Sequence, residues 1–286
     1  KKVKKLDYMI NIEDITFVIT TFKSEKVINN CLKELPEVSQ KIIIENSSDH
    51  SFKENLERKY KNLKCHLMLK NIGYGSANNM GIKKSNTNYV FIINPDTFLS
   101  KNILNKLLQI LSEEEFSIAS VLEEGEKKEN NFNSKIIKEV DFVKGFAMLI
   151  NKKNMFGKYF DENIFLYLEE VDLCLNVKKK GGRIILVNLE VKHLGGNSHG
   201  ALDDFEMEKS RNWHWMWSKF YFSKKHNGYI LALMKTLPNF LSSLIKYIFY
   251  FISFNKKKIK YEMRLLGLIN SYLLRKSYYR PYSKKV

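Results

Sequence analysis

Short apolar runs alternate with helical patterns along the first hundred residues. Runs rich in β-branched and aromatic residues cover 15–20, 41–45, 64–70 and 89–94, and longer segments with helical periodicity separate them. This alternation is typical of parallel strands joined by crossover helices. The pattern therefore predicts an α/β fold whose functional loops lie at the carboxyl ends of its strands.

The pattern changes after about residue 203 from mixed strand and helix to helix alone. Helical segments are expected at 205–228 and 229–254. We predict a catalytic domain over residues 1–202 and a helical, aromatic and basic region over 203–286. The catalytic domain is expected to hold further strands at 116–121, 140–151, 183–188 and 191–200.

The apolar run at 229–254 is long, but polar residues interrupt it at Lys235, Pro238, Asn239 and Lys246. Such interruptions disfavour a membrane-spanning helix and favour a pair of helices lying at a membrane interface. The alternative is a helical core packed on the catalytic domain or on a second subunit.

The basic charge of the chain is concentrated near its end. The formal net charge is +17, and ten basic residues against one acid from residue 256 onward supply nine of those charges. A basic segment beside apolar helices suits an anionic lipid leaflet. The chain shows no RNA-binding or helix-turn-helix signature, so we expect no nucleic-acid partner.

The cysteine pattern indicates a reducing compartment. Cys31, Cys65 and Cys174 are odd in number and far apart in the sequence, which argues against a disulfide scaffold or a zinc ribbon. The N-terminal residues turn acidic before any long apolar run, so no secretion signal is expected. We predict a cytoplasmic protein that is peripheral on the inner face of the cell membrane.

Polar clusters follow the first, second and fourth predicted strands, as "TFKSE", "NSSD" and "NPDT". In a parallel sheet these loops share one edge, so we expect them to form one crevice. Asn94 and Asp96 could present two oxygens to Mg²⁺ or Mn²⁺, which would bridge a nucleoside diphosphate. Alternatively, Asp96 caps the helix that starts near Lys101 or closes a turn.

Two other segments could bind ligand or metal. In "NIGYGSANNMGI" (71–82), Gly73 and Gly75 would let backbone approach a phosphate at a helix start, although a plain strand-to-helix turn explains them equally well. His193 ends a predicted strand, where a histidine is more often packed than liganding, and it could join a metal near Asp96.

Three acids, Glu169, Glu170 and Asp172, open a predicted helix that ends near residue 181. Acids in a first turn complement the helix dipole, which accounts for one or two of them. The apolar run 165–168 precedes them, and apolar surroundings raise a carboxyl pKa and suit a general base.

These motifs, in this order, resemble those of glycosyltransferase family 2, the inverting GT-A enzymes, and within it the bacterial rhamnosyltransferase-like branch. The resemblance covers residues 13 to about 200. It implies a Rossmann-like, mainly parallel central sheet flanked by helices, with a C-terminal helical extension. The motifs that carry it are "TTFKSE", "IENSSD", "NIGYGSANNMG", "NPDT", "GFAMLI", "YFDENIFLYLEEVDLCL" and "VKHLGG".

The resemblance implies a role for several residues. Glu45 would contact the nucleotide, Asp96 and His193 would bind Mg²⁺ or Mn²⁺, Glu170 would be the catalytic base, and Asp172 would orient the site. Glu170 stands where Asp is usual, so the choice between Glu169 and Glu170 stays open. The expected nucleotide-sugar contacts are Thr20, Phe22, Glu45, Asn46, Gly73, Gly75, Asn78, Asn79, Asn94, Asp96 and Gly145.

Two further positions depart from the family pattern. Glu45 replaces the usual Asp, and Asn94 replaces the first acid of the metal motif. The longer side chain of Glu45 changes its reach toward a base or ribose. An amide at position 94 would lower the affinity for the metal.

The function implied is transfer of a sugar, with inversion, from a nucleotide-sugar donor to a glycan or lipid-linked acceptor in cell-surface polysaccharide synthesis. The branch makes dTDP-rhamnose or a UDP-sugar the expected donor. Two alternatives remain: a nucleotidyltransferase of similar fold, and a basic module that binds lipid or nucleic acid. A nucleotidyltransferase would need a more basic loop after the first strand than "TTFKSE".

Overall fold

The computed structural model describes residues 9–126, 132, 135–195 and 204–280. The described residues form two compact units. The larger unit lies within 9–72, 76–160 and 173–195, and the smaller unit comprises 73–75, 161–172 and 204–280. The predicted boundary between 202 and 203 lies outside the described residues, so that domain division stays a prediction.

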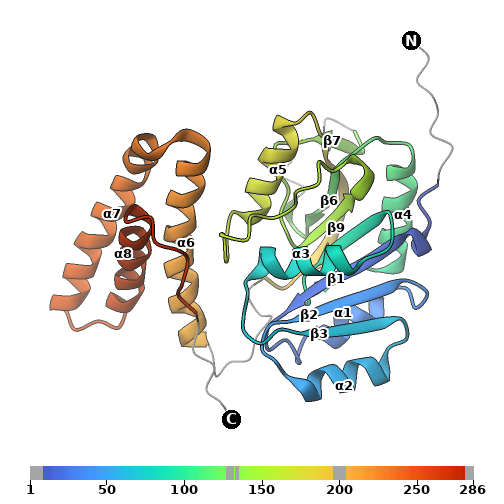
Figure 1. Ribbon diagram of the computed structural model, residues 1–286, viewed down its shortest axis with the longest axis horizontal. Coiled ribbons are helices and arrows are strands. Elements are labelled where there is room, and N and C mark those ends of the chain that lie inside the picture. The colour runs from blue at the N-terminus through green and yellow to red at the C-terminus, as the bar shows by residue number, and fades with distance from the viewer. Residues whose placement is uncertain (1–8, 127–131, 133–134, 196–203, 281–286) are drawn as a thin grey trace. The chain divides into compact units, whose positions relative to one another are not determined.

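The larger unit is built on a single nine-stranded sheet (Figure 1). Its strand order is β3-β2-β1-β4-β8-β6-β9-β5, with β7 paired to β9. The first four strands in that order are parallel, as the sequence predicts, and the remainder is mixed. The strands are β1 (Ile15–Thr21), β2 (Gln40–Glu45), β3 (Leu63–Leu67), β4 (Tyr89–Ile93), β5 (Thr97–Phe98), β6 (Ile118–Glu123), β7 (Ile137–Glu139), β8 (Ala147–Asn151) and β9 (Ile184–His193).

Helices cover both faces of this sheet, because successive strand residues point to opposite sides. Phe17 and Ile19 of β1 belong to a core that also contains residues of α1, α2 and α4. On the opposite face Gly81 of α3 lies against Val18, where an added Cβ would come within 2.3 Å of that side chain. The helices are α1 (Ile28–Glu34), α2 (His50–Lys59), α3 (Tyr74–Lys84), α4 (Lys101–Ser112) and α5 (Glu169–Lys179), with short 3-10 turns at Ile12–Asp14 and Lys152–Asn154.

Several strand predictions were wrong in their extent. The strand expected at 64–70 ends at Leu67, and the one expected at 116–121 begins at Ile118. Residues 140–146 are not strand, and only Ala147–Asn151 forms β8. The predicted strands at 183–188 and 191–200 include one continuous strand, β9, and residues 196–200 lie outside the described range. Residues 189 and 190 separated the two predicted strands, but both belong to β9. The pairing of β9 with β6 is irregular at this point, since Val121 pairs with Val187 and Leu122 pairs with Glu190.

The smaller unit contains three helices that pack side by side (Figure 1). They are α6 (Asp204–Asn227), α7 (Tyr229–Ile252) and α8 (Lys258–Tyr272). Gly267 of α8 allows a close approach to α6, because an added Cβ would lie 2.3 Å from the Trp213 carbonyl oxygen. The sequence analysis missed α8, since frequent charges obscure the spacing of its buried Met263 and Leu268.

α7 is one helix, so the predicted pair of helices over this run was wrong. Pro238 lies inside it and removes only one backbone hydrogen bond. Ala232, Thr236 and Ser243 form its buried face, and this packing outweighs the break. Over the described residues, no helix combines the length and the apolar character needed to cross a bilayer.

Candidate functional site

The polar clusters predicted at the strand ends do meet at one edge of the sheet. β2, β1 and β4 are neighbours and run parallel, so their carboxyl ends lie together. Thr20, Glu45 and Asn94 lie at or just after those ends. The crevice predicted from the sequence therefore has the topology that positions ligands in open α/β sheets.

Glu45 is buried at the end of β2, with both carboxylate oxygens hydrogen-bonded. The Thr21 hydroxyl donates to Oε2, and Ser47 donates its hydroxyl and its backbone N–H (2.6 Å) to Oε1. Burial raises the pKa of Glu45, and the hydrogen bonds from Ser47 and Thr21 oppose that rise. A carboxylate can accept about four hydrogen bonds, so Glu45 keeps capacity for a ligand hydroxyl or N–H.

The two asparagines of the glycine-rich motif have different environments. Asn79 is hydrogen-bonded to the Phe160 backbone in both directions, at 2.9 and 3.0 Å, which holds the chain there in place. Asn78 accepts a hydrogen bond from the Thr20 hydroxyl at 2.9 Å, and its Nδ2 is buried with no hydrogen-bond partner in the described part of the chain. Asn78 therefore has a donor left for a ligand.

The other expected nucleotide-sugar contacts lie near the same strand ends or in the smaller unit. Phe22 is half-buried after β1, Asn46 is buried after β2, and Gly145 is half-buried before β8. Gly75 is buried and belongs to the smaller unit. Their roles stay predictions.

Gly73 permits a close contact between two backbone segments of the smaller unit. Its φ is +90°, and an added Cβ would lie 2.6 Å from the Phe165 carbonyl oxygen. The same oxygen accepts a hydrogen bond from the Tyr74 N–H at 3.0 Å. Only glycine combines that backbone angle with that approach, so Gly73 fixes the path of the segment that leads to the three acids.

Asp96 and His193 lie together because β5 pairs with β9, with Thr97 opposite His193. The Nε2 atom of His193 is 3.3 Å from Oδ1 of Asp96 and 3.3 Å from Nδ2 of Asn94. Asp96 does not cap α4, since the Ser100 side chain accepts the hydrogen bond from the Ile103 N–H. The alternative of a helix cap at Asp96 was therefore wrong.

Glu123 and Phe146 hold the His193 ring in place. Nδ1 of His193 is 3.1 Å from Oε1 of Glu123, and the Phe146 ring stacks on the imidazole with 4.9 Å between ring centroids. Burial alone would lower the pKa of His193, but the carboxylates of Asp96 and Glu123 outweigh it and raise that pKa. The sequence analysis missed Glu123, which lies 70 residues away in the chain.

The residues around His193 fit a divalent cation that a ligand completes. Oδ1 of Asp96 is buried; within the described residues it forms no hydrogen bond of regular geometry, and Nε2 of His193 lies 3.3 Å from it. A histidine held by a carboxylate through one nitrogen and presenting the other is common in metal sites. The described residues contain no cluster of three or more such acidic, histidine or cysteine ligands. A metal here would therefore take its remaining ligands from phosphate oxygens or water.

The two residues just before α5 have a left-handed backbone conformation. Tyr167 and Leu168 have φ values of +71° and +69°, which residues other than glycine rarely adopt. Such conformations store strain and are frequent at functional sites. Here they turn the chain so that Glu169 and Glu170 begin the helix.

Glu169 and Glu170 differ in exposure and in their capacity to hold a proton. Glu169 is buried, and its Oε2 has no hydrogen-bond partner among the described residues, whereas Glu170 is half-exposed. Burial, and then the charge of Glu170, raises the pKa of Glu169 well above its usual range. Burial also raises the pKa of Glu170. Of the two acids, Glu169 therefore has the stronger tendency to keep its proton, and Glu170 is the more exposed carboxyl group.

Asp172 is fully buried and contacts the end of α6 through an ion pair with Lys225 and a hydrogen bond with His226. Lys225 lies 2.8 Å from Oδ2 and His226 2.7 Å from Oδ1. Lys225 also pairs with Asp161 at 2.7 Å, and the Tyr221 hydroxyl donates to the same oxygen of Asp161. Asp172 therefore attaches the start of α5 to α6, and sequence spacing gave no signal for its partners on α6.

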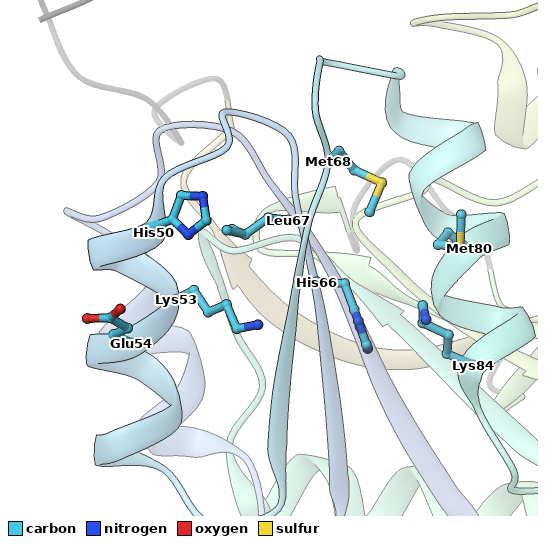
Figure 2. Close-up of a pocket in the computed structure, with 8 residues that line it drawn as sticks. All are labelled: His50, Lys53, Glu54, His66, Leu67, Met68, Met80 and Lys84. Atoms are coloured by element: carbon cyan, nitrogen blue, oxygen red, sulfur yellow. The ribbon is translucent and has the colours of Figure 1, made fainter.

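A separate cationic groove of about 540 Å³ lies beside the edge strand β3. Figure 2 shows its lining: His50, Lys53 and Glu54 from α2, His66, Leu67 and Met68 in or just after β3, and Met80 and Lys84 from α3. Burial, and then the positive charges of Lys84 and Lys53, lowers the pKa of His66. The groove contains none of the residues predicted for the site.

The family model described as glycosyl transferase family 2 matches residues 16–174, more than half of the chain. The chain belongs to this family. The matched range includes the strand-end clusters, the glycine-rich motif and all three acids of α5, and it ends before His193. The resemblance to family 2 is thereby confirmed, and the rhamnosyltransferase-like branch stays a prediction.

Similar proteins agree with this membership. The family 2 chain is 25% identical over 198 residues to the low-salt glycan biosynthesis hexosyltransferase Agl10 of Haloferax volcanii, a match covering 59% of this chain and 63% of that protein. The fold is similar to S. aureus TarS 1-349 in complex with UDP (TM-score 0.54, 13% identity, 93% of each chain). It is also similar to the mannosyltransferase PcManGT of Pyrobaculum calidifontis with GDP-Man and Mn²⁺ (TM-score 0.55, 11% identity, 90% and 86%). The similar solved structures confirm the GT-A fold predicted for this chain.

Proposed function

We propose that the chain transfers a sugar from a nucleoside diphosphate donor to a hydroxyl group of an acceptor, inverting the anomeric carbon. The observation that carries this proposal is the position of Asp96 beside His193 at the carboxyl edge of the sheet, where the buried Oδ1 of Asp96 forms no regular hydrogen bond within the described residues. A buried carboxylate oxygen of this kind suits a cation bound together with a diphosphate.

Each part of the site has a stated task in this reaction. Asp96 and His193 would hold Mg²⁺ or Mn²⁺, which when bound neutralises charge on the departing diphosphate. Glu170 takes the proton from the acceptor hydroxyl as that oxygen attacks the anomeric carbon. Glu169 stays protonated, so it does not compete for that proton. Asp172 holds the start of α5 through Lys225 and His226.

Membership of the family supports a nucleotide sugar as the donor, and an experiment has to identify which nucleotide sugar it is. Solved relatives are described with UDP, UDP-GlcNAc and GDP-Man, and the motif branch adds dTDP-rhamnose. We expect the purified chain to release nucleoside diphosphate from one of these donors with Mn²⁺ or Mg²⁺, slowly without an acceptor. If a panel of UDP-, dTDP- and GDP-sugars gave no release and no binding, the proposed function would be wrong.

We also propose that α7 attaches the protein to the inner face of the cell membrane. Seven apolar residues lie three or four positions apart along α7, and all are exposed by 44% or more: Ile230, Met234, Leu237, Leu241, Ile245, Ile248 and Ile252. This spacing places them in one stripe on the helix. Lys256 and Lys257 follow and are exposed, which complements an anionic lipid surface. A lipid-linked acceptor would be present there.

A pair of charges in the apolar stripe tests this attachment. The double change Leu241→Glu and Ile245→Glu is expected to weaken binding to vesicles containing anionic lipid by at least about thirtyfold, because charged side chains resist burial in the interface. Ser242→Glu, an exposed neighbour outside the stripe, is the matched control and is expected to lower binding only slightly. Co-sedimentation measures the binding.

Two results would contradict the membrane assignment. One is unchanged vesicle binding by the double variant. The other is sedimentation of the wild type as a dimer that the double variant converts to a monomer, with no vesicle binding by either. The second result would make the stripe a surface for a second copy of the chain.

A further inference from the structure

The smaller unit contains a cavity of about 400 Å³ that the proposed chemistry does not use. Its walls are the segment just before the acids of α5, one face of α6, and the chain that follows α8. The lining residues are Glu162, Asn163, Phe165, Trp217, Tyr221, Lys224, Ser271, Leu274, Arg275, Lys276, Ser277 and Arg280. Its volume falls in the range of small-ligand sites.

The wall formed by residues 274–280 is hydrogen-bonded to α6. The Trp217 indole N–H donates to the Arg275 carbonyl oxygen at 3.0 Å. His214 contacts the Ser277 hydroxyl at 3.1 Å and the Tyr279 carbonyl oxygen at 2.9 Å. This part of the chain therefore has a defined position although it lies in no helix, and the cavity has fixed walls.

The cavity is positively charged. It is lined by four cations, Lys224, Arg275, Lys276 and Arg280, and by one acid, Glu162. None of the four cations forms an ion pair with a carboxylate within the described residues. Such a set of unneutralised cations on fixed walls favours a phosphate or another compact anion.

Aromatic rings lie beside these cations. Trp217 and Tyr221 stack with 4.8 Å between ring centroids, and Lys224 lies over the Tyr221 ring at 5.6 Å. The Arg280 guanidinium lies 3.8 Å from the centre of the Phe165 ring. The rings give the cavity an apolar wall beside the cations, and small-ligand sites combine apolar walls with a few polar groups. The lining therefore suits a sugar joined to a phosphate.

One wall of the cavity is formed by residues that lie just before the proposed catalytic base in the sequence. Phe165 of its wall precedes Glu170 by five residues, and both belong to the smaller unit. Tyr221 of its wall donates a hydrogen bond to Asp161 at 3.0 Å. This bond connects the cavity wall to the segment that leads to the three acids. A ligand held here would lie in the same unit as Glu170, whereas Glu45, which is expected to contact the nucleotide, belongs to the larger unit.

We infer that this cavity binds the acceptor, and that the acceptor carries a phosphate next to the sugar that receives the new bond. The inference rests on the proposed function and names its acceptor class. The phosphate contacts Arg275, Lys276 and Lys224, and the sugar lies toward Tyr221. A lipid-linked sugar phosphate and a phosphate-containing glycan share this chemistry.

Calorimetric titration of the full chain with α-D-glucose 1-phosphate tests the inference, with glucose and inorganic phosphate as the other two probes. We expect glucose 1-phosphate to bind at least about fivefold more tightly than either of the other probes. The double change Arg275→Gln and Lys276→Gln is expected to weaken its binding at least about tenfold. Lys224→Gln, a single change on α6, is expected to weaken it about threefold.

The groove in Figure 2 provides the matched control. Lys53→Gln with Lys84→Gln removes two positive charges from that other cavity and is expected to change the binding of glucose 1-phosphate by less than twofold. If this control lowered the affinity as much as the Arg275 and Lys276 changes, general charge or the groove would account for binding, and the inference would be wrong. Equal affinity for phosphate and glucose 1-phosphate would contradict the sugar part.

Release of nucleoside diphosphate from the donor, measured on the same preparations, separates the two proposals. If the wild type turns over donor and binds no glucose 1-phosphate, the acceptor inference fails and the proposed function stands. If no donor is turned over or bound, the proposed function fails whatever the titration shows. Loss of donor turnover in the Arg275 and Lys276 variant would assign the cavity to the donor and overturn the inference.

Phospholipid vesicles without sugar, added as a competitor, are expected to leave the affinity for glucose 1-phosphate unchanged.

Discussion

Glu170→Gln is expected to lower sugar transfer by about a thousandfold or more and to leave donor binding within about twofold of the wild type. The amide cannot take a proton from the acceptor hydroxyl, and general base catalysis contributes about 10²- to 10⁴-fold. The change keeps the size of a half-exposed side chain and creates no cavity. Transfer rate and donor affinity measured on the same preparation check this result.

Glu169→Gln is the matched control for that change. Glu169 is buried, and burial and then the charge of Glu170 raise its pKa, so the proposed mechanism gives it no role in taking up the proton. An amide in its place should lower transfer by less than about tenfold. If the loss fell on Glu169→Gln and spared Glu170→Gln, the assignment of the base would be reversed. If both variants kept full transfer, the base would lie elsewhere, and Asp172 would be the next candidate.

Asp96→Asn is expected to weaken Mn²⁺ binding by at least about tenfold and to lower release of nucleoside diphosphate by at least about a hundredfold. The variant keeps the shape of a side chain that is only 2% exposed, but it loses the charge that a cation needs. The free Mn²⁺ signal in electron paramagnetic resonance, with and without nucleoside diphosphate, reads the binding separately from activity.

Asp141→Asn is the control for Asp96→Asn. Asp141 is an exposed acid of the same unit that pairs with Lys178, so its loss should leave both readouts unchanged. Glu123→Gln should also lower the Mn²⁺ affinity, by about tenfold, because it weakens the hold on the His193 ring without removing a ligand. Equal Mn²⁺ binding by Asp96→Asn and the wild type would contradict the assignment of Asp96.

Local patterns in the chain predict most of the larger unit. The strands β1, β2 and β4 lie within a residue or so of their predicted positions, because each is a compact apolar run bounded by polar residues. β5 was missed because a two-residue strand has no periodicity, and it exists only through its pairing with β9. That short pairing is also what brings Asp96 to His193.

The sequence by itself determined that this is an α/β protein of the glycosyltransferase type, since motif order and the positions of polar clusters after strands are local properties of the chain. Tertiary structure alone decided how the acids differ. Glu169, Glu170 and Asp172 stand within four residues, yet their environments differ. Glu169 is buried with its Oε2 unpaired among the described residues, Glu170 is half-exposed, and Asp172 contacts Lys225 and His226, more than fifty residues away. Burial and distant partners set the charge of a carboxyl group, and neither can be read from neighbouring letters.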